Sequence, residues 1–90
     1  MKPEPKIFIV DDDADLLPAM VEVIEAAGLP ARGFQRGKAM LAELDPEWDG
    51  MILSDMRMPE LSGLDLLAEA RAMAPGVPFV LITAHGDVRS

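Results

Sequence analysis

The apolar residues of the chain gather in three short runs, and each run ends against polar residues. These runs are Ile7–Val10, Met51–Ser54 and Phe79–Thr83. Because they are short, rich in branched side chains and apolar at successive positions, they are typical of strands buried on both faces of a parallel sheet. A weaker strand is expected at residues 31–35, so the pattern predicts four strands.

Between these runs the apolar residues recur at the spacing of a helix. The first helix is expected from about Asp15 to Ala27, with one apolar stripe and outward-facing glutamates. Gly28 follows it, at the position where glycine commonly ends a helix. A short second helix is expected at residues 37–44. A third helix opens at a capping sequence that starts with Ser62 and runs to about Met73.

Strands that alternate with helices of about a dozen residues imply right-handed β–α–β units. The expected fold class is therefore α/β, with a doubly wound parallel sheet. We divide the chain into a flexible N-terminus at residues 1–5, where two prolines surround a charge, and one domain at residues 6–90.

Charge and composition exclude several classes of protein. The formal net charge is −8, from 16 acidic and 8 basic residues, and no basic stripe offers contacts to nucleic-acid phosphates. The chain has no cysteine, which excludes disulfides and thiolate metal sites. No apolar run approaches membrane-spanning length, and the first residues lack the apolar core of a signal peptide. We expect a cytoplasmic domain that binds neither nucleic acid nor membrane.

The strongest strands end in residues that carry oxygen ligands. Asp11 and Asp12 follow the first run, Asp55 follows the second, and Thr83 ends the third. Parallel strands bring such ends to one edge of the sheet, where α/β proteins bind ligands. Converging carboxylates repel one another, and a bound cation relieves that repulsion. Oxygen ligands without histidine or thiolate favour Mg²⁺.

Three motifs in order resemble the receiver domain of two-component response regulators. They are Ile9–Asp13, then Leu53–Pro59 with Gly63 after it, then Ile82–Ala84. The resemblance covers nearly all of residues 6–90. It implies a flavodoxin-like (CheY-like) sheet with the strand order 2-1-3-4-5.

The resemblance also implies a role for each site residue. Asp55 matches the phosphoacceptor, and Thr83 matches the hydroxyl that swings toward the phosphoryl group. Asp11 and Asp12 match the acid pair that binds Mg²⁺, Asp55 is a metal ligand as well, and the backbone carbonyl of Arg57 matches a further one. A third acid, Asp13, follows the pair, but the spacing favours Asp11 and Asp12.

The family implies partners as well as chemistry. The phosphoryl donor would be a sensor histidine kinase, and the chain would be a phosphoacceptor that assists its own phosphotransfer and dephosphorylation, not a turnover enzyme. A homodimer through the receiver is expected. Residues 54–59 and 84–87 are most similar to the nitrogen-regulator and dicarboxylate-transport classes, which implies an ATPase and a DNA-binding domain downstream and control of transcription. FixJ-like regulators share residues 85–87.

The family pattern continues beyond the end of this chain. It has a further helix, a strand ending in a lysine that contacts the phosphoryl group, and a last helix, whereas the chain ends at Ser90. Lys2, Lys6 and Lys38 lie in the wrong places to replace that lysine. We therefore expect a receiver domain that is incomplete at its C-terminus, with exposed apolar faces and low stability by itself.

Other interpretations of the acidic residues stay open. One is a degenerate receiver that acts only as a protein-interaction module. A second is a phosphohydrolase of the haloacid-dehalogenase kind, although the residues two beyond the acids, Asp13 and Ala14, do not match that motif. A third is an EF-hand loop, which Leu16 opposes because it occupies the glycine position.

Overall fold

Four parallel strands in the order β2-β1-β3-β4 form the sheet of this protein, in a computed structural model that describes residues 4–82. The strands are β1 Ile7–Val10, β2 Ala31–Phe34, β3 Met51–Asp55 and β4 Phe79–Ile82. The helices are α1 Leu16–Ala26, α2 Gly37–Glu43 and α3 Gly63–Met73. Each element that the pattern predicts within these residues is present, and the bounds differ by one residue or less.

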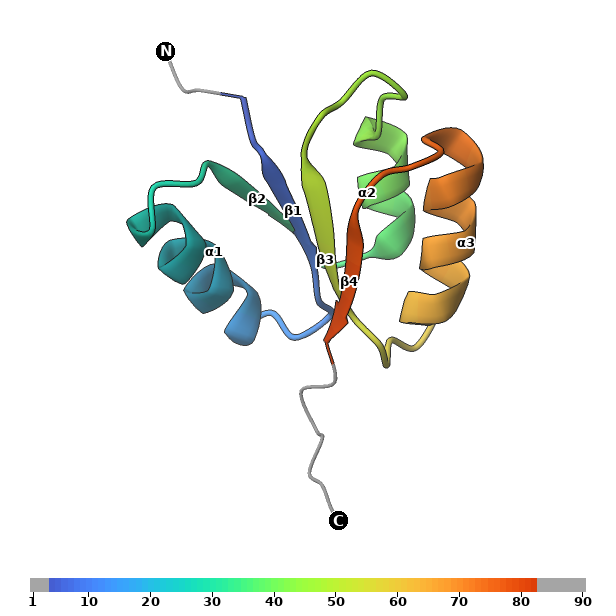
Figure 1. Ribbon diagram of the computed structural model, residues 1–90. Coiled ribbons are helices and arrows are strands. Elements are labelled where there is room, and N and C mark those ends of the chain that lie inside the picture. Colours follow the sequence, from blue (N-terminus) through green and yellow to red (C-terminus); the bar gives the residue numbers. More distant parts are fainter. Residues whose placement is uncertain (1–3, 83–90) are drawn as a thin grey trace.

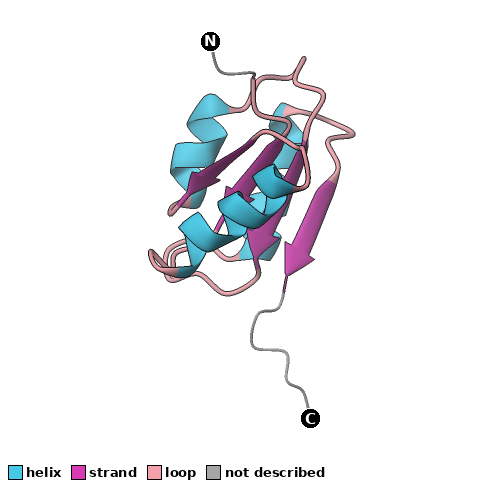
Figure 2. Cartoon of the chain, turned by 90° about the vertical axis from the view of Figure 1, so that its left-hand side faces the viewer, coloured by secondary structure: helices cyan, strands magenta, loops and turns pink. Residues whose placement is uncertain are grey.

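The helices lie on both faces of the sheet, as a doubly wound fold requires. Helix α1 lies on one face, against β1 and β2, and α2 and α3 lie on the other face (Figures 1 and 2). The chain runs outward from β1 to β2 and then returns to the other side of β1 as β3. This reversal makes the carboxyl ends of β1 and β3 the switch point, where such sheets bind ligands. The expected order 2-1-3-4 is confirmed for the four described strands.

The apolar side chains of β1 alternate between two cores. Phe8 and Val10 pack on the side of α2 and α3, while Ile7 and Ile9 pack on the side of α1 with Leu17. All four residues of β1 are buried. A strand that is apolar at successive positions is therefore explained by a sheet with a hydrophobic layer on each face.

Helix α1 ends in a Schellman motif built around a glycine. Gly28 has φ +94°, a left-handed conformation that other residues adopt only with strain. Its N–H donates to the carbonyl of Glu25 at 2.9 Å, and the N–H of Leu29 donates to the carbonyl of Ile24 at 3.3 Å. These two bonds satisfy two of the last four carbonyls of the helix. The predicted role of Gly28 is confirmed.

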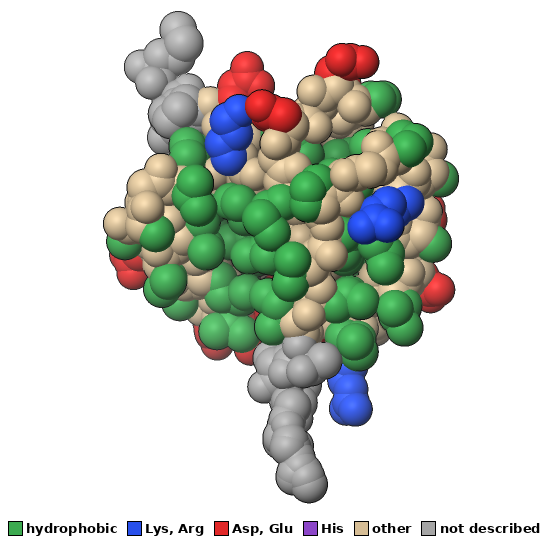
Figure 3. Space-filling view, viewed as in Figure 1, with side chains coloured by type: hydrophobic (Ala, Val, Ile, Leu, Met, Phe, Trp, Pro, Cys, Tyr) green, Lys and Arg blue, Asp and Glu red, His purple; other side chains and the backbone are tan. Residues whose placement is uncertain are grey.

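The face of the sheet beside α1 carries exposed apolar side chains (Figure 3). Val23 of α1 is 68% exposed and Val80 of β4 is 43% exposed. A hollow of about 320 Å³ lies between α1 and the strands, with Leu53 and Ile82 among its lining residues. None of the helices in residues 4–82 is long and apolar enough to cross a membrane.

Trp48 lies near the start of the strands, at the opposite end of the sheet from the acidic residues. Its indole stacks on Phe8, with ring centroids 4.1 Å apart and an angle of 18° between the planes. Its Nε1 donates a hydrogen bond of 2.9 Å to the carbonyl of Pro5. Trp48 therefore holds the segment before β1 against the sheet.

Candidate metal and phosphoacceptor site

Two carboxylates lie side by side at the carboxyl ends of β1 and β3. Val10 pairs with Ser54 in the sheet, so the next residues, Asp11 and Asp55, are neighbours on adjacent strands. Asp12 follows Asp11 in the turn. One carboxylate oxygen from each of the three aspartates lies within 4.8 Å of the others. The structure thus brings together the three carboxylates that were predicted to form a metal site.

The surroundings of these carboxylates favour a cation. Asp11 is 3% exposed and Asp55 is 6% exposed, while Asp12 is exposed to solvent. Burial raises the pKa of Asp11 above its ordinary value, and repulsion from Asp55 and Asp12 adds to the rise. None of the three forms an ion pair with another residue in positions 4–82. Their negative charge is therefore not neutralised by the described part of the chain.

The third acid of the run has a different task. The backbone N–H of Asp13 donates to Oδ1 of Asp11 at 2.9 Å, which partly offsets the raised pKa of Asp11. Oδ1 of Asp13 accepts from the N–H groups of Asp15 and Leu16, at 2.9 and 3.1 Å. It thereby satisfies free N–H groups at the start of α1. Asp11 and Asp12, and not Asp13, make up the acidic cluster with Asp55.

A glycine lets the start of α3 approach the end of β3. A side chain at Gly63 would place its Cβ 2.6 Å from the carbonyl oxygen of Asp55, and the N–H of Gly63 donates to the carbonyl of Met56 at 2.9 Å. Ser62 caps the helix, because its Oγ accepts from the N–H of Asp65 at 3.2 Å. The backbone that carries Asp55 is therefore held by the first turn of α3.

The remaining predicted site residues are Arg57 and Thr83. The N–H of Arg57 donates to Oδ1 of Asp55 at 3.4 Å, a long hydrogen bond that places Arg57 beside the cluster. Its carbonyl as a metal ligand stays a prediction. Thr83 lies outside the described residues. Ile82, the last described residue of β4, pairs with Asp55.

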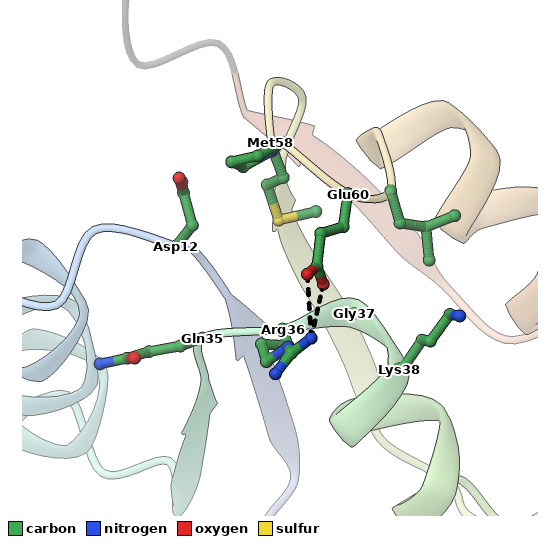
Figure 4. A pocket seen from close by; sticks show the side chains of 9 residues that line it. Asp12, Gln35, Arg36, Gly37, Lys38, Met58 and Glu60 are labelled. Carbon is green, nitrogen blue, oxygen red and sulfur yellow. Dashed lines mark hydrogen bonds and ion pairs between the residues drawn. The ribbon is translucent and has the colours of Figure 1, made fainter.

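Sequence reasoning missed a groove that begins at the acidic cluster. It has a volume of about 330 Å³ and lies between the start of α2 and the loop of residues 56–62, which we call the β3–α3 loop (Figure 4). Asp12 lines one end. Arg36 reaches across and donates to both carboxylate oxygens of Glu60, at 2.8 and 2.9 Å. No local pattern could have shown this pair, because 24 positions separate its members.

The donor set of the cluster fits Mg²⁺. All three side chains offer carboxylate oxygens, which are hard ligands, and one open side of the cluster is exposed through Asp12. Mg²⁺ is commonly held by one or a few carboxylates together with waters and phosphate oxygens. The three carboxylates are therefore a donor set that could hold a divalent cation.

Comparison with known proteins gives a consistent result. Residues 7–90 match the family described as response regulator receiver domain. The C4-dicarboxylate transport transcriptional regulatory protein DctD of Rhizobium meliloti (strain 1021) is 39% identical over 88 residues, which cover 98% of this chain and 19% of DctD. The DNA-binding transcriptional regulator NtrC of Salmonella typhimurium is 34% identical over 82 residues, which cover 91% of this chain and 18% of NtrC.

A solved structure agrees with these sequence relatives. The response regulator StyR superposes with a TM-score of 0.83 at 35% identity, over 98% of this chain and 44% of the StyR chain. The chain spans about a fifth of the length of the two curated relatives. The expected likeness to the nitrogen-regulator and dicarboxylate-transport classes is confirmed.

Proposed function

The chain belongs to the response regulator receiver domain family, and from this premise we propose that it is a phosphoacceptor switch with Asp55 as the acceptor. The observation that supports the proposal best is the cluster of Asp11, Asp12 and Asp55 at the switch point of the sheet. A receiver is a signalling module. Its chemistry serves to change its own state.

Asp55 is the nucleophile of the proposed reaction. A carboxylate oxygen of Asp55 forms a bond to the phosphorus of a phosphohistidine, the nitrogen–phosphorus bond breaks, and the histidine leaves with its bonding electron pair. The hydrogen bond from the N–H of Arg57 orients this carboxylate. Burial on the strand end fixes its position, and positioning supplies much of the catalysis in phosphoryl transfer.

Asp11, Asp12, Asp55 and the carbonyl of Arg57 are the proposed ligands of Mg²⁺. When bound, the ion neutralises the charge that the carboxylates and the incoming phosphoryl group share. Neutralisation by the ion matters most for Asp11, because burial and its acidic neighbours already raise its pKa. In the proposal, Thr83 carries the change onward, since its hydroxyl turns toward the phosphoryl group and biases a two-state surface.

The partners follow from the proposed chemistry. The donor is a sensor histidine kinase, and water later hydrolyses the acyl phosphate with help from the same site. DctD and NtrC are described as transcriptional regulators, so the output of this protein is proposed to be transcription, through regions outside this chain. The receiver is further proposed to form a homodimer.

One experiment tests the phosphoacceptor. The intact protein is incubated with acetyl phosphate and Mg²⁺, and the intact mass of the wild type is compared with that of Asp55→Asn. One added phosphoryl group on the wild type alone supports the proposal. No label on either protein would favour a module that only binds partners. Steady phosphate release that depends on Asp11 would favour a hydrolase.

A further inference from the structure

The β3–α3 loop is docked on the start of α2 by two neighbouring pairs of residues. Arg36 holds Glu60 through both carboxylate oxygens, at 2.8 and 2.9 Å. Gly37 lies against Leu61, and a Cβ at position 37 would be 3.1 Å from Cδ2 of Leu61. Two consecutive residues of one segment thus contact two consecutive residues of the other. This is a fitted contact between loop and helix, and it forms the wall of the groove.

Arg36 is free to make this bridge. Its backbone is extended, with φ −134° and ψ 137°, at the position before α2, and its side chain makes no capping bond to the helix. Figure 4 shows the carboxylate of Glu60 pointing to Arg36, with Asp12 on one side of this pair and Lys38 on the other. The positive charge of Arg36 therefore neutralises the carboxylate of Glu60.

The middle of the loop has few other polar tethers within the described residues. At its start, the N–H of Arg57 makes only a 3.4 Å bond to Asp55. At its end, the N–H of Gly63 donates to the carbonyl of Met56. Met58 and Leu61 pack against the core. Glu60 is the one residue between these ends whose side chain is joined by an ion pair to another element in residues 4–82.

We propose that Arg36 is a positioning residue for the metal site, because its ion pair with Glu60 holds the β3–α3 loop and thereby the backbone of Arg57. The inference rests on the proposed function, in which the carbonyl of Arg57 is a Mg²⁺ ligand. Arg36 touches neither metal nor phosphoryl group. It acts through Glu60 and the short stretch of loop between Glu60 and Arg57.

The solvent exposure of the Arg36–Glu60 ion pair limits how much its loss can change Mg²⁺ affinity. The side chains of Arg36 and Glu60 are 66% and 64% exposed. Exposed ion pairs contribute little, so a variant can weaken Mg²⁺ binding by about two- to fivefold and no more. For the same reason, loss of the pair should leave the fold intact.

Two substitutions distinguish positioning of the β3–α3 loop from a long-range effect of charge on Mg²⁺ affinity. Arg36→Gln removes a positive charge and Glu60→Gln removes a negative one, and both break the pair. If only the long-range field mattered, Mg²⁺ affinity would rise in the first variant and fall in the second. If the pair positions the loop, affinity falls in both, and the exchanged pair Arg36→Glu with Glu60→Arg restores it.

A matched control lies elsewhere on the surface. Arg32 forms an ion pair of 3.2 Å with Glu43, and their side chains are 53% and 48% exposed. Arg32→Gln therefore removes the same charge and a similar pair without touching the β3–α3 loop. It measures the general effect of one lost positive charge on Mg²⁺ binding.

Two measurements on the intact protein test the role of Arg36. Calorimetric titration with Mg²⁺ is expected to show dissociation constants about two- to fivefold higher in Arg36→Gln and Glu60→Gln than in Arg32→Gln. Hydrogen exchange of the metal-free proteins is expected to be faster at the amides of Arg57, Met58, Glu60 and Leu61 in these two variants alone. Affinities equal to the control, or moving in opposite directions, with unchanged exchange, would overturn the inference. A wild type that binds no Mg²⁺ would instead count against the proposed function.

Discussion

Asp11, the residue directly after β1, lies beside Asp55 at the end of β3, and both residues are almost fully buried. Each has an oxygen within 4.8 Å of the other. Two buried like charges at this separation oppose folding, since each loses hydration and repels its neighbour. The arrangement therefore favours a positively charged ligand, and it lowers the free energy of unfolding of the metal-free protein.

The first prediction concerns Asp11→Asn. Loss of this charge should raise the free energy of unfolding of the metal-free protein by about 1 kcal/mol, the usual size of a single-residue effect, although here with a stabilising sign. The same variant should lose most of the stabilisation that Mg²⁺ gives the wild type. Urea unfolding followed by circular dichroism, with and without Mg²⁺, measures both. A variant less stable than the metal-free wild type would contradict the repulsion argument.

The second prediction is a pH dependence. The pKa of Asp11 in the folded protein is raised above its ordinary value of 3.8, so the folded state binds more protons than the unfolded state between these two pKa values. The contribution of Asp11 to stability is thus fully present below the ordinary pKa and is lost as pH rises through the folded pKa. Other acids titrate in the same range, so the informative quantity is the difference between Asp11→Asn and the wild type.

In the absence of Mg²⁺, that difference in unfolding free energy should grow over the pH range that begins at the ordinary pKa of 3.8 and extends upward through the raised pKa of folded Asp11. Added Mg²⁺ should shrink it at the upper end of the range, since the bound ion compensates the ionised carboxylate. A difference that stays constant across the range would show that Asp11 titrates normally.

The third prediction contrasts two glycines. Gly63→Ala places a methyl group 2.6 Å from the carbonyl oxygen of Asp55, and overpacking of this kind costs about 1–3 kcal/mol. It should also slow labelling by acetyl phosphate, because the backbone of the acceptor must shift. Gly28→Ala should cost about 1–2 kcal/mol through its left-handed backbone alone.

Nothing lies within 4 Å of a Cβ built on Gly28, which makes that variant the control for stability loss without crowding. Its labelling rate should equal that of the wild type at a temperature where both are folded. Equal slowing in both variants would mean that lost stability, and not the position of Asp55, controls labelling.

The fourth prediction concerns the cap of α3. Ser62→Ala removes the acceptor for the N–H of Asp65 and should lower the free energy of unfolding by about 1 kcal/mol. Ser62→Asp keeps an acceptor at the same place and should remain within about 0.5 kcal/mol of the wild type. Thermal unfolding of the two variants side by side checks this. A similar loss in both would show that the cap bond contributes little.

The features of this protein that depend on a few neighbouring residues could be predicted from the sequence. The apolar run Ile7–Val10 and the glycine after α1 each carry their structural meaning within a few residues, so the elements and their ends were predictable. The acids could be placed because parallel strands share one carboxyl edge. One capping residue is expected in such an acidic run, but three consecutive aspartates are alike in sequence, so it could not be foreseen that Asp13 is the one that accepts from the N–H groups at the start of α1.

Contacts between distant segments could not be foreseen in the same way. Arg36 and Glu60 meet because β2 and β3 lie on either side of β1 and all three strands end at one edge of the sheet, which brings the segments after β2 and β3 together. Trp48 likewise donates to the carbonyl of Pro5, which is 43 positions away, because the fold brings the two segments together. The periodicity of the sequence indicates which face of its helix or strand a residue occupies. Only the complete fold determines which distant residue it contacts.

The position of Trp48 makes its fluorescence a probe of the sheet that is separate from the acidic cluster. It is the single tryptophan of the chain, and its indole is stacked on Phe8 near the start of β1, whereas the acidic cluster lies beyond the end of that strand. Its emission will therefore follow the integrity of the sheet and stay largely indifferent to ions arriving at the far edge. An optical signal that does respond to Mg²⁺ would report a change carried along the length of β1.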